Sequence, residues 1–147
     1  MGLGNYSMYD DSVGIRVIEY IFENNLEKDF MAIDLSANTI NLFSYLNAET
    51  KKIVFVDTAK MGMNPGEHKI FKLDQVETQK NVGNFSTHEG DIIKMINFAK
   101  ETNYPIPEIV FVGIEPETMK SDFGISETLS KNISNYALAA IGEITLS

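Results

Sequence analysis

Five ionisable side chains stand at positions where an α/β fold would bring them together. The adjacent Asp10 and Asp11 come just before an amphipathic segment, Asp34 and Asp57 each follow an apolar run, and His88 opens a second helical pattern. In an open α/β sheet, the carboxyl ends of parallel strands and the N-termini of the following helices meet at one edge. We therefore expect these side chains to face one crevice.

Two carboxylates and an imidazole form a donor set that suits a divalent transition ion such as zinc, nickel or manganese. An ion held by three protein ligands could polarise a peptide carbonyl and lower the pKa of a bound water. Each residue also has an ordinary explanation: Asp10 and Asp11 are acids of the kind favoured at a helix N-terminus, and Asp57 could cap a turn. Residue types alone leave both interpretations open.

Short apolar runs predict the strands that would position these groups. Ile53–Val56 and Ile109–Val112 are apolar at every residue, which is typical of parallel strands covered on both faces. Phe30–Ile33, ahead of Asp34, is a weaker third candidate, and His68–Leu73 reads as an edge strand after a turn.

Helical patterns alternate with these runs. We expect helices from Ser12 to about Asn24 and from Ile40 to Leu46, a third that begins with the capping box Ser86–Glu89, and a last helix capped by Ser126. Alternating helices and strands predict an α/β, three-layer domain with a mostly parallel twisted sheet flanked by helices. Residues 1–147 fit one domain.

Composition excludes several functions. The formal net charge is -9, from 12 basic and 21 acidic residues, and no basic cluster is present to bind a row of phosphates, so we expect no nucleic-acid partner. There are no cysteines, which excludes thiolate metal sites and cysteine nucleophiles. Apolar runs are too short to span a membrane, and the N-terminus does not resemble a signal peptide. We expect a cytoplasmic monomer.

Two other ligand chemistries start from the same residues. Gly2-Leu3-Gly4 could begin a dinucleotide-binding turn, but Ser7 stands where the third glycine belongs, and no strand precedes the turn. An acidic pair with a strand-end Asp57 could form the phospho-aspartate pocket of a receiver domain. That pocket needs a lysine after the last core strand, where this chain has Glu115.

Seven short motifs, taken together in this order and spacing, resemble the nickel-iron hydrogenase maturation endopeptidases. They are GLGN at 2–5, Asp10-Asp11, Val13-Gly14, Ile53 to Asp57, Pro65-Gly66, Ser86-Thr87-His88, and VGIEPE at 112–117. The resemblance runs from Gly2 to about Leu129. It implies a protease that removes a short C-terminal extension from the precursor of a hydrogenase large subunit, and so activates that enzyme.

The resemblance also implies roles for single residues. Asp11, Asp57 and His88 correspond to the metal-binding residues, and the metal is nickel supplied by the precursor, for which zinc or another divalent ion could substitute. As in an aspartyl protease, Asp57 would be the general base if the metal serves mainly in recognition, with Asp11 as the second catalytic acid. Substrate-binding positions fall on Gly4, Asn5, Asp34 and Asn38.

The sequence departs from the family in two places. Members usually carry a hydrophobic strand ahead of the first glycine motif, and Met1 directly precedes Gly2 here. We therefore expect this first strand either to be missing or to lie upstream of a wrongly assigned start. A glycine-rich turn is replaced by Asp34–Thr39, which predicts altered precursor specificity. Two alternatives stay open: a non-catalytic protein that binds the precursor or a metal on the same fold, and the receiver domain.

Overall fold

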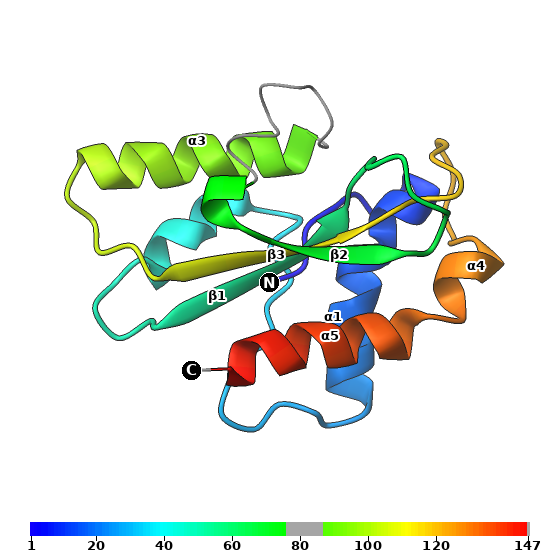
Figure 1. Cartoon of the computed structure of the whole chain (residues 1–147), viewed down its shortest axis with the longest axis horizontal. Coiled ribbons are helices and arrows are strands. Elements are labelled where there is room, and N and C mark those ends of the chain that lie inside the picture. Colours follow the sequence, from blue (N-terminus) through cyan, green and yellow to red (C-terminus); the bar gives the residue numbers. More distant parts are fainter. Residues whose placement is uncertain (76–86, 147) are drawn as a thin grey trace.

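The structure, a computed structural model, describes residues 1–75 and 87–146. Its elements follow in this order: the 3-10 helix η1 (Tyr9–Ser12), α1 (Val13–Glu23), the 3-10 helix η2 (Thr39–Tyr45), β1 (Lys52–Thr58), β2 (His68–Lys72), α3 (Thr87–Glu101), β3 (Glu108–Ile114), α4 (Glu127–Ser130) and α5 (Ile133–Thr145) (Figure 1). Within these ranges, no helix is both long enough and apolar enough to cross a bilayer.

The sheet has the order β1-β3-β2. β1 and β3 run parallel in a register that pairs Asp57 with Gly113, and β2 runs antiparallel to β3. The two expected apolar strands are confirmed, and the edge strand expected at His68–Leu73 is β2. In β2 only Phe71 is buried, as expected for a strand at a sheet edge.

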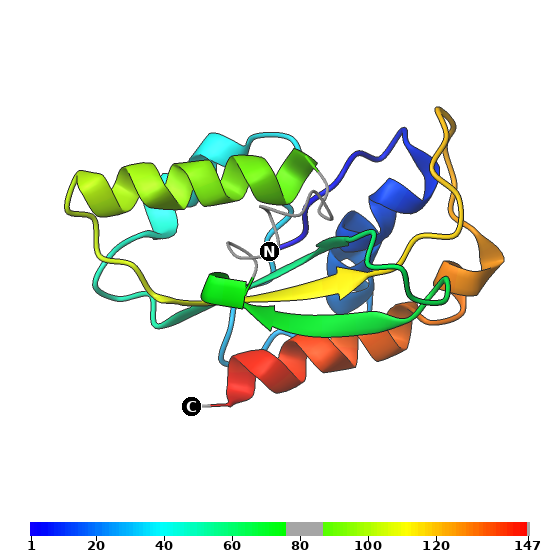
Figure 2. The same ribbon diagram turned by 45° about the horizontal axis from the view of Figure 1, so that its top comes forward.

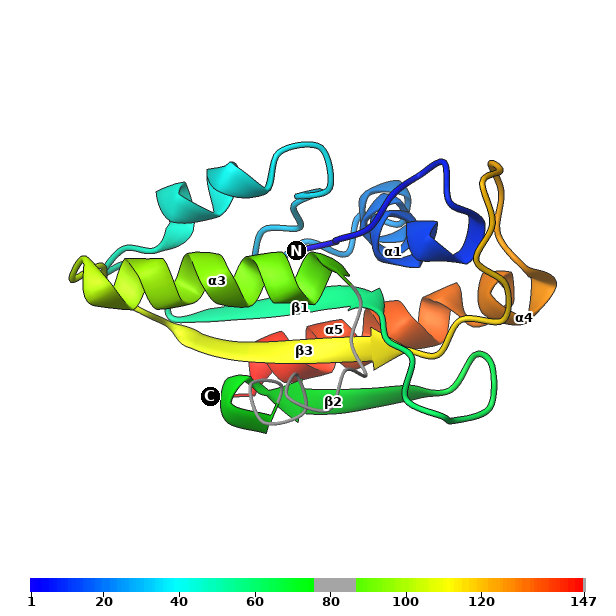
Figure 3. The same cartoon turned by 90° about the horizontal axis from the view of Figure 1, so that it is seen from above.

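Both faces of the sheet are covered, as the uninterrupted apolar runs predict. Ile53 and Phe55 pack into one core with α3 and η2, whereas Val54 and Val56 pack into a second core with α1 and α5. Figures 2 and 3 show α3 and η2 on one side of the strands and α5 on the other. The α/β three-layer prediction is therefore confirmed.

The first three residues lie along the outer edge of β1. Leu3 N–H donates to the Val56 carbonyl at 3.0 Å, and Val56 N–H donates to the Met1 carbonyl at 2.9 Å. Gly2 forms single parallel bridges with Val56 and with Asp34. The expectation of a missing first strand is thus refined, because these residues take a strand position through isolated bridges.

Two predicted elements are wrong. Phe30–Ile33 is no strand: a groove of about 490 Å³, lined by Phe30, Ile33 and Val54 among others, separates it from the first half of β1. Ile33, its last residue, accepts at its carbonyl from the Gly2 N–H at 2.8 Å, but this bond alone makes no ladder. The last helix is two helices, α4 and α5, with a turn at residues 131–132.

Two further predictions need qualification. The short helix predicted at Ile40 to Leu46 is the 3-10 helix η2. Ser126 does cap a helix, and its hydroxyl accepts from the Leu129 N–H. The Ser86 half of the capping box predicted for α3 lies outside the described residues.

Candidate functional site

A tight turn at Gly4 and Asn5 presents Asp11. Gly4 has a φ of 129°, and a Cβ at this position would overlap the carbonyl oxygen of Asp11. The Asn5 N–H donates to that same carbonyl at 3.2 Å, and the Asn5 Oδ1 accepts from the Ser7 N–H and hydroxyl at 3.0 and 2.8 Å. Glycine is required here because other residues rarely adopt this φ and have no room for their side chain.

A second glycine brings the start of α1 against the end of β1. A Cβ on Gly14 would overlap the carbonyl oxygens of Leu3 and Val56. The backbone of α1 can therefore lie directly on the sheet, one turn after Asp11. This close packing explains how a residue near the N-terminus reaches the residues that end β1.

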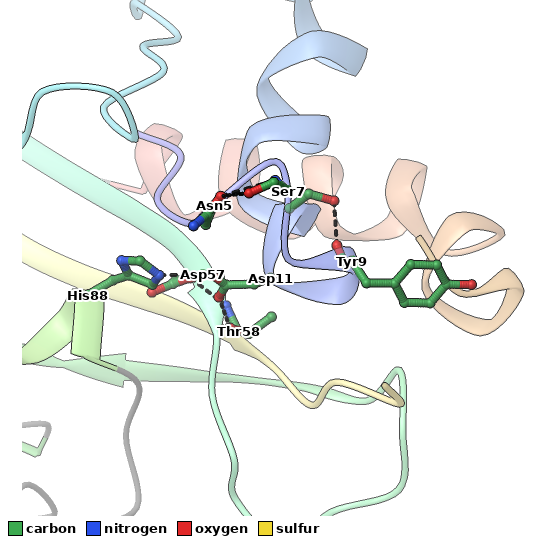
Figure 4. Close-up of polar contacts among 8 residues, drawn as sticks. Asn5, Ser7, Tyr9, Asp11, Asp57, Thr58 and His88 are labelled. Atoms are coloured by element: carbon green, nitrogen blue, oxygen red, sulfur yellow. Dashed lines mark hydrogen bonds and ion pairs between the residues drawn. The ribbon is translucent and has the colours of Figure 1, made fainter. Parts of the chain in front are cut away.

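Asp57 and Thr58 end β1 side by side, and both are only 1% exposed. The Thr58 N–H donates to Asp57 Oδ1 at 2.8 Å. The Thr58 hydroxyl donates to Asp11 Oδ1 at 2.9 Å. Thr58 therefore links the two carboxylates of the site, as Figure 4 shows.

His88 completes the group from α3. Its Nε2 lies 2.8 Å from Asp11 Oδ2, and its side chain is 27% exposed against 5% for that of Asp11. The hydrogen bond with Asp11, together with the negative charges of Asp57, Asp11 and Asp91, raises the pKa of His88 to about 9, although burial opposes this rise. At neutral pH the site thus holds an imidazolium. Figure 4 shows the contact of His88 with Asp11.

The side chains of Asp11, Asp57 and His88 could hold a metal ion together only after a small shift in their positions. Two ligand atoms bound about 2.1 Å from one ion at right angles lie about 3 Å apart, close to the 2.8 Å between His88 Nε2 and Asp11 Oδ2. Among the described side chains, however, no three histidine, cysteine, aspartate or glutamate groups form a ready metal centre. The oxygen and imidazole donors fit a divalent transition ion, which would have to gather them as it binds.

The sequence model of the hydrogenase maturation proteases matches residues 15–143. The chain belongs to this family. One relative, from Methanocaldococcus jannaschii and named a hydrogenase maturation protease, is 31% identical over 80% of this chain and 70% of its own length. A second protein of that organism with the same name is 26% identical over 98% of this chain and 94% of its own.

Solved structures of hydrogenase maturation proteases share the fold. The [NiFe] hydrogenase maturation protease HybD from Thermococcus kodakarensis superposes with a TM-score of 0.82 at 19% identity, over 97% of this chain and 95% of that one. HybD from E. coli gives 0.79 at 19% identity, over 98% and 91% of the two chains. Family membership removes the dinucleotide-binding and receiver alternatives.

Asp10 stands apart from this cluster. Its side chain is 0% exposed. It accepts from the backbone N–H groups of Glu117, Thr118 and Ser126 at 2.9, 2.8 and 2.7 Å, and from the Ser126 hydroxyl at 3.0 Å. Four donors from one loop make Asp10 a clamp for that loop.

Asp34 and Asn38 lie near the same sheet edge but do not join the cluster. Gly2 bridges both Asp34 and Val56, which places Asp34 level with the residue before Asp57. Asp34 Oδ1 accepts from the N–H and hydroxyl of Ser36 at 2.9 and 2.6 Å. Asn38 is the exposed N-cap residue of η2. Each of these side chains shapes or borders a turn.

Two residues near the site, Thr58 and Glu115, were given no role by the sequence analysis. Thr58 stands beside Asp57 without any motif or spacing to mark its hydroxyl. Glu115, 7% exposed, accepts from the N–H groups of Met61 and Met63 at 2.7 and 2.9 Å, and so fixes the loop that follows β1. Glu115 lies within the VGIEPE motif, but no role followed from the sequence beyond its being an acid where a receiver domain needs lysine.

Proposed function

We propose that this member of the maturation protease family is an endopeptidase that removes a short C-terminal extension from the nickel-loaded precursor of a hydrogenase large subunit. The observation that carries the proposal is the 2.8 Å contact of His88 Nε2 with Asp11 Oδ2, made next to the buried Asp57. In a protein of this family, two acids and an imidazole at one sheet edge supply what recognition of an ion and hydrolysis beside it require.

Nickel enters this proposal as part of the substrate. Before the precursor binds, one proton lies between His88 and Asp11. When the precursor brings its ion, that proton leaves, and Asp11, Asp57 and His88 become ligands. A precursor without nickel offers no such gain in binding, so cleavage depends on nickel loading. Zinc or another divalent ion of similar preference for oxygen and imidazole donors can substitute.

Asp57 is the proposed general base. Its carboxylate is held at Oδ1 by the Thr58 N–H, which fixes its direction. In the hydrolysis, the oxygen of a water molecule bonds to the peptide carbonyl carbon while Asp57 takes a proton from that water. The same proton is then delivered to the leaving amine when the C–N bond breaks. Asp11 is the second catalytic aspartate of the proposal, because its carboxylate orients the His88 imidazole and balances the positive charge of that ring.

The precursor is the proposed partner, met by the loops around the site. Gly4 and Asn5 shape one loop, and Asp34 and Asn38 belong to the other; the extension of the precursor would lie between them. Because the Asp34–Thr39 turn lacks the family's glycines, we expect it to select a different extension. A monomer acting in the cytoplasm completes the proposal.

The test is the intact mass of a large-subunit precursor after incubation with this chain. Nickel-loaded and nickel-free precursor are each treated with wild type, with Asp57→Asn, and with the control Asp29→Asn, which changes an exposed aspartate on the loop after α1. We expect loss of one C-terminal peptide with wild type and the control only, and only from loaded precursor.

Two other results would decide against this function. Binding of the precursor by wild type without any change in its mass would favour the non-catalytic binding protein. Equal cleavage of nickel-free precursor would remove nickel from recognition and leave a protease of another specificity.

A further inference from the structure

We propose that Thr58 is a positioning residue that makes Asp11 a one-oxygen ligand, and that it thereby favours a small transition ion over calcium at this site. The inference rests on the proposed function in one respect only, that Asp11 and His88 bind the ion. Thr58 itself touches neither peptide nor ion in this proposal. It acts through the carboxylate that it holds.

The two donors of Thr58 go to two different carboxylates. Its backbone N–H binds Asp57 Oδ1 at 2.8 Å, and its hydroxyl binds Asp11 Oδ1 at 2.9 Å. Thr58 is only 1% exposed, and its backbone is fixed in β1, where it pairs with Ile114 of β3. Both donors therefore come from a rigid part of the sheet (Figure 4).

This leaves the two oxygens of Asp11 with unequal tasks. Oδ1 faces a fixed hydroxyl, and Oδ2 faces His88 at 2.8 Å. An ion that displaces the proton shared with His88 meets Oδ2. Swinging Oδ1 toward the same ion would break its hydrogen bond to Thr58 inside a buried site, where a charged group that loses its hydrogen bond is costly.

Ions differ in how much they need the second oxygen. Calcium collects about six to eight oxygen ligands and often takes a carboxylate through both oxygens. Nickel and zinc accept a few donors at shorter distances, and imidazole suits them. A carboxylate restricted to one oxygen next to an imidazole therefore costs calcium more than it costs nickel.

A purely structural role is the competing explanation. The Thr58 hydroxyl could serve only to satisfy a buried carboxylate, in which case its removal would weaken all ligands alike. The two explanations differ in the ratio of nickel to calcium affinity. A loss of stability, by itself, would not separate them.

The test measures binding of Ni²⁺ alone and Ca²⁺ alone by titration calorimetry, for wild type, Thr58→Ser and Thr58→Val. Valine keeps the shape without the hydroxyl, and serine keeps the hydroxyl. Because groups that orient a metal ligand are worth about 10–100-fold in affinity, we expect Thr58→Val to weaken Ni²⁺ binding by about tenfold or more. Binding of Ca²⁺ should weaken less or improve, and Thr58→Ser should keep the wild-type ratio.

Three results would overturn the inference: an equal loss for both ions in Thr58→Val, unchanged binding in that variant, or no measurable Ni²⁺ binding by wild type. Thermal unfolding of each variant shows that the comparison is made on folded protein. If Thr58→Val does not fold, a shift of the ratio in Thr58→Ala, which removes the hydroxyl and adds no new ligand atom, replaces it as the deciding measurement.

The outcome is independent of precursor cleavage. A chain that binds nickel with a Thr58-dependent preference but leaves the precursor intact would sustain this inference and refute the protease. If the Thr58→Val variant cleaves loaded precursor as well as wild type does, and its ratio of Ni²⁺ to Ca²⁺ affinity is unchanged, the protease is supported and this inference is refuted.

Discussion

Asp10 and Asp11 are neighbours in the chain, and their carboxylates end in opposite surroundings. Asp10 accepts from three backbone N–H groups and one hydroxyl, all on the loop before α4 and at the cap of α4. Asp11 accepts from one hydroxyl and shares a proton with His88. Three donors of the first set are part of the backbone and cannot be exchanged. The second includes a proton that can leave, which is what a site needs if an ion is to enter.

The largest effect should come from His88→Ala, which removes that exchangeable partner. We expect the rate of precursor cleavage to fall by about 100-fold or more, since loss of an ion ligand should cost more than the roughly 10–100-fold that loss of a group orienting a ligand costs. The matched control is His68→Ala, because His68 lies on the exposed edge strand β2. Retained cleavage in His88→Ala would contradict the proposed site.

The Asp10 side of the comparison predicts a loss of stability instead of activity. Asp10→Asn removes the charge that four donors address, and hydrogen bonds to a charged group are worth about 1.5–3 kcal/mol each. We expect the free energy of unfolding in urea to fall by about 3 kcal/mol. Affinity for Ni²⁺ should stay near that of wild type.

Asp11→Asn is the reciprocal variant and should do the opposite. It should abolish Ni²⁺ binding at a smaller cost in unfolding free energy. If Asp10→Asn weakened Ni²⁺ binding as much as Asp11→Asn did, the division between clamp and site would be incorrect.

Binding of Ni²⁺ should also depend on pH. The pKa of His88 is raised to about 9, so below that pH the ion must displace a proton. We expect affinity to rise about tenfold per pH unit between about 7 and 9 and then to level off, because one proton is released per ion. Calorimetry in buffers of different ionisation enthalpy counts the protons; His88→Ala should show no such slope in any residual binding.

The smallest effect concerns stability against pH. Folding raises the pKa of His88 from 6.5 to about 9, so its pairing with Asp11 stabilises the fold fully below pH 6.5. This contribution is lost as pH rises through about 9. The difference in melting temperature between wild type and His88→Ala should therefore shrink over that range; a constant difference would show that the pairing adds nothing through its charge.

The sequence predicted those elements whose structure depends on residues close together in the chain. Ile53–Val56 and Ile109–Val112 could be recognised as two-faced strands because each residue had to be apolar, and Asp57 followed as the acid at the end of its strand, where it pairs with Gly113. Asp11 and His88 could be assigned to the same edge by topology. The contact of His88 with Asp11 confirms that they meet.

The rest depends on long-range partners. Nothing local distinguishes Asp10 from Asp11, because the donors that separate them come from residues more than 100 positions away. The Thr58 hydroxyl has the same difficulty, since its acceptor lies 47 positions earlier in the chain. The last predicted helix is interrupted at residues 131–132: α4 is tied to Asp10 through Ser126, while α5 follows the sheet (Figure 1).

The paired bridges of Gly2 have a consequence for engineering the protein. Since Gly2 joins Val56 and Asp34, its register fixes the spacing between the turn at residues 34–39 and the end of β1, and a slip by one residue would shift them by about 3.3 Å. A side chain at Gly2 would collide with the carbonyl oxygen of Gly14 and with Ile18. A designer seeking a new precursor should therefore diversify the exposed positions of that turn and leave Gly2 untouched.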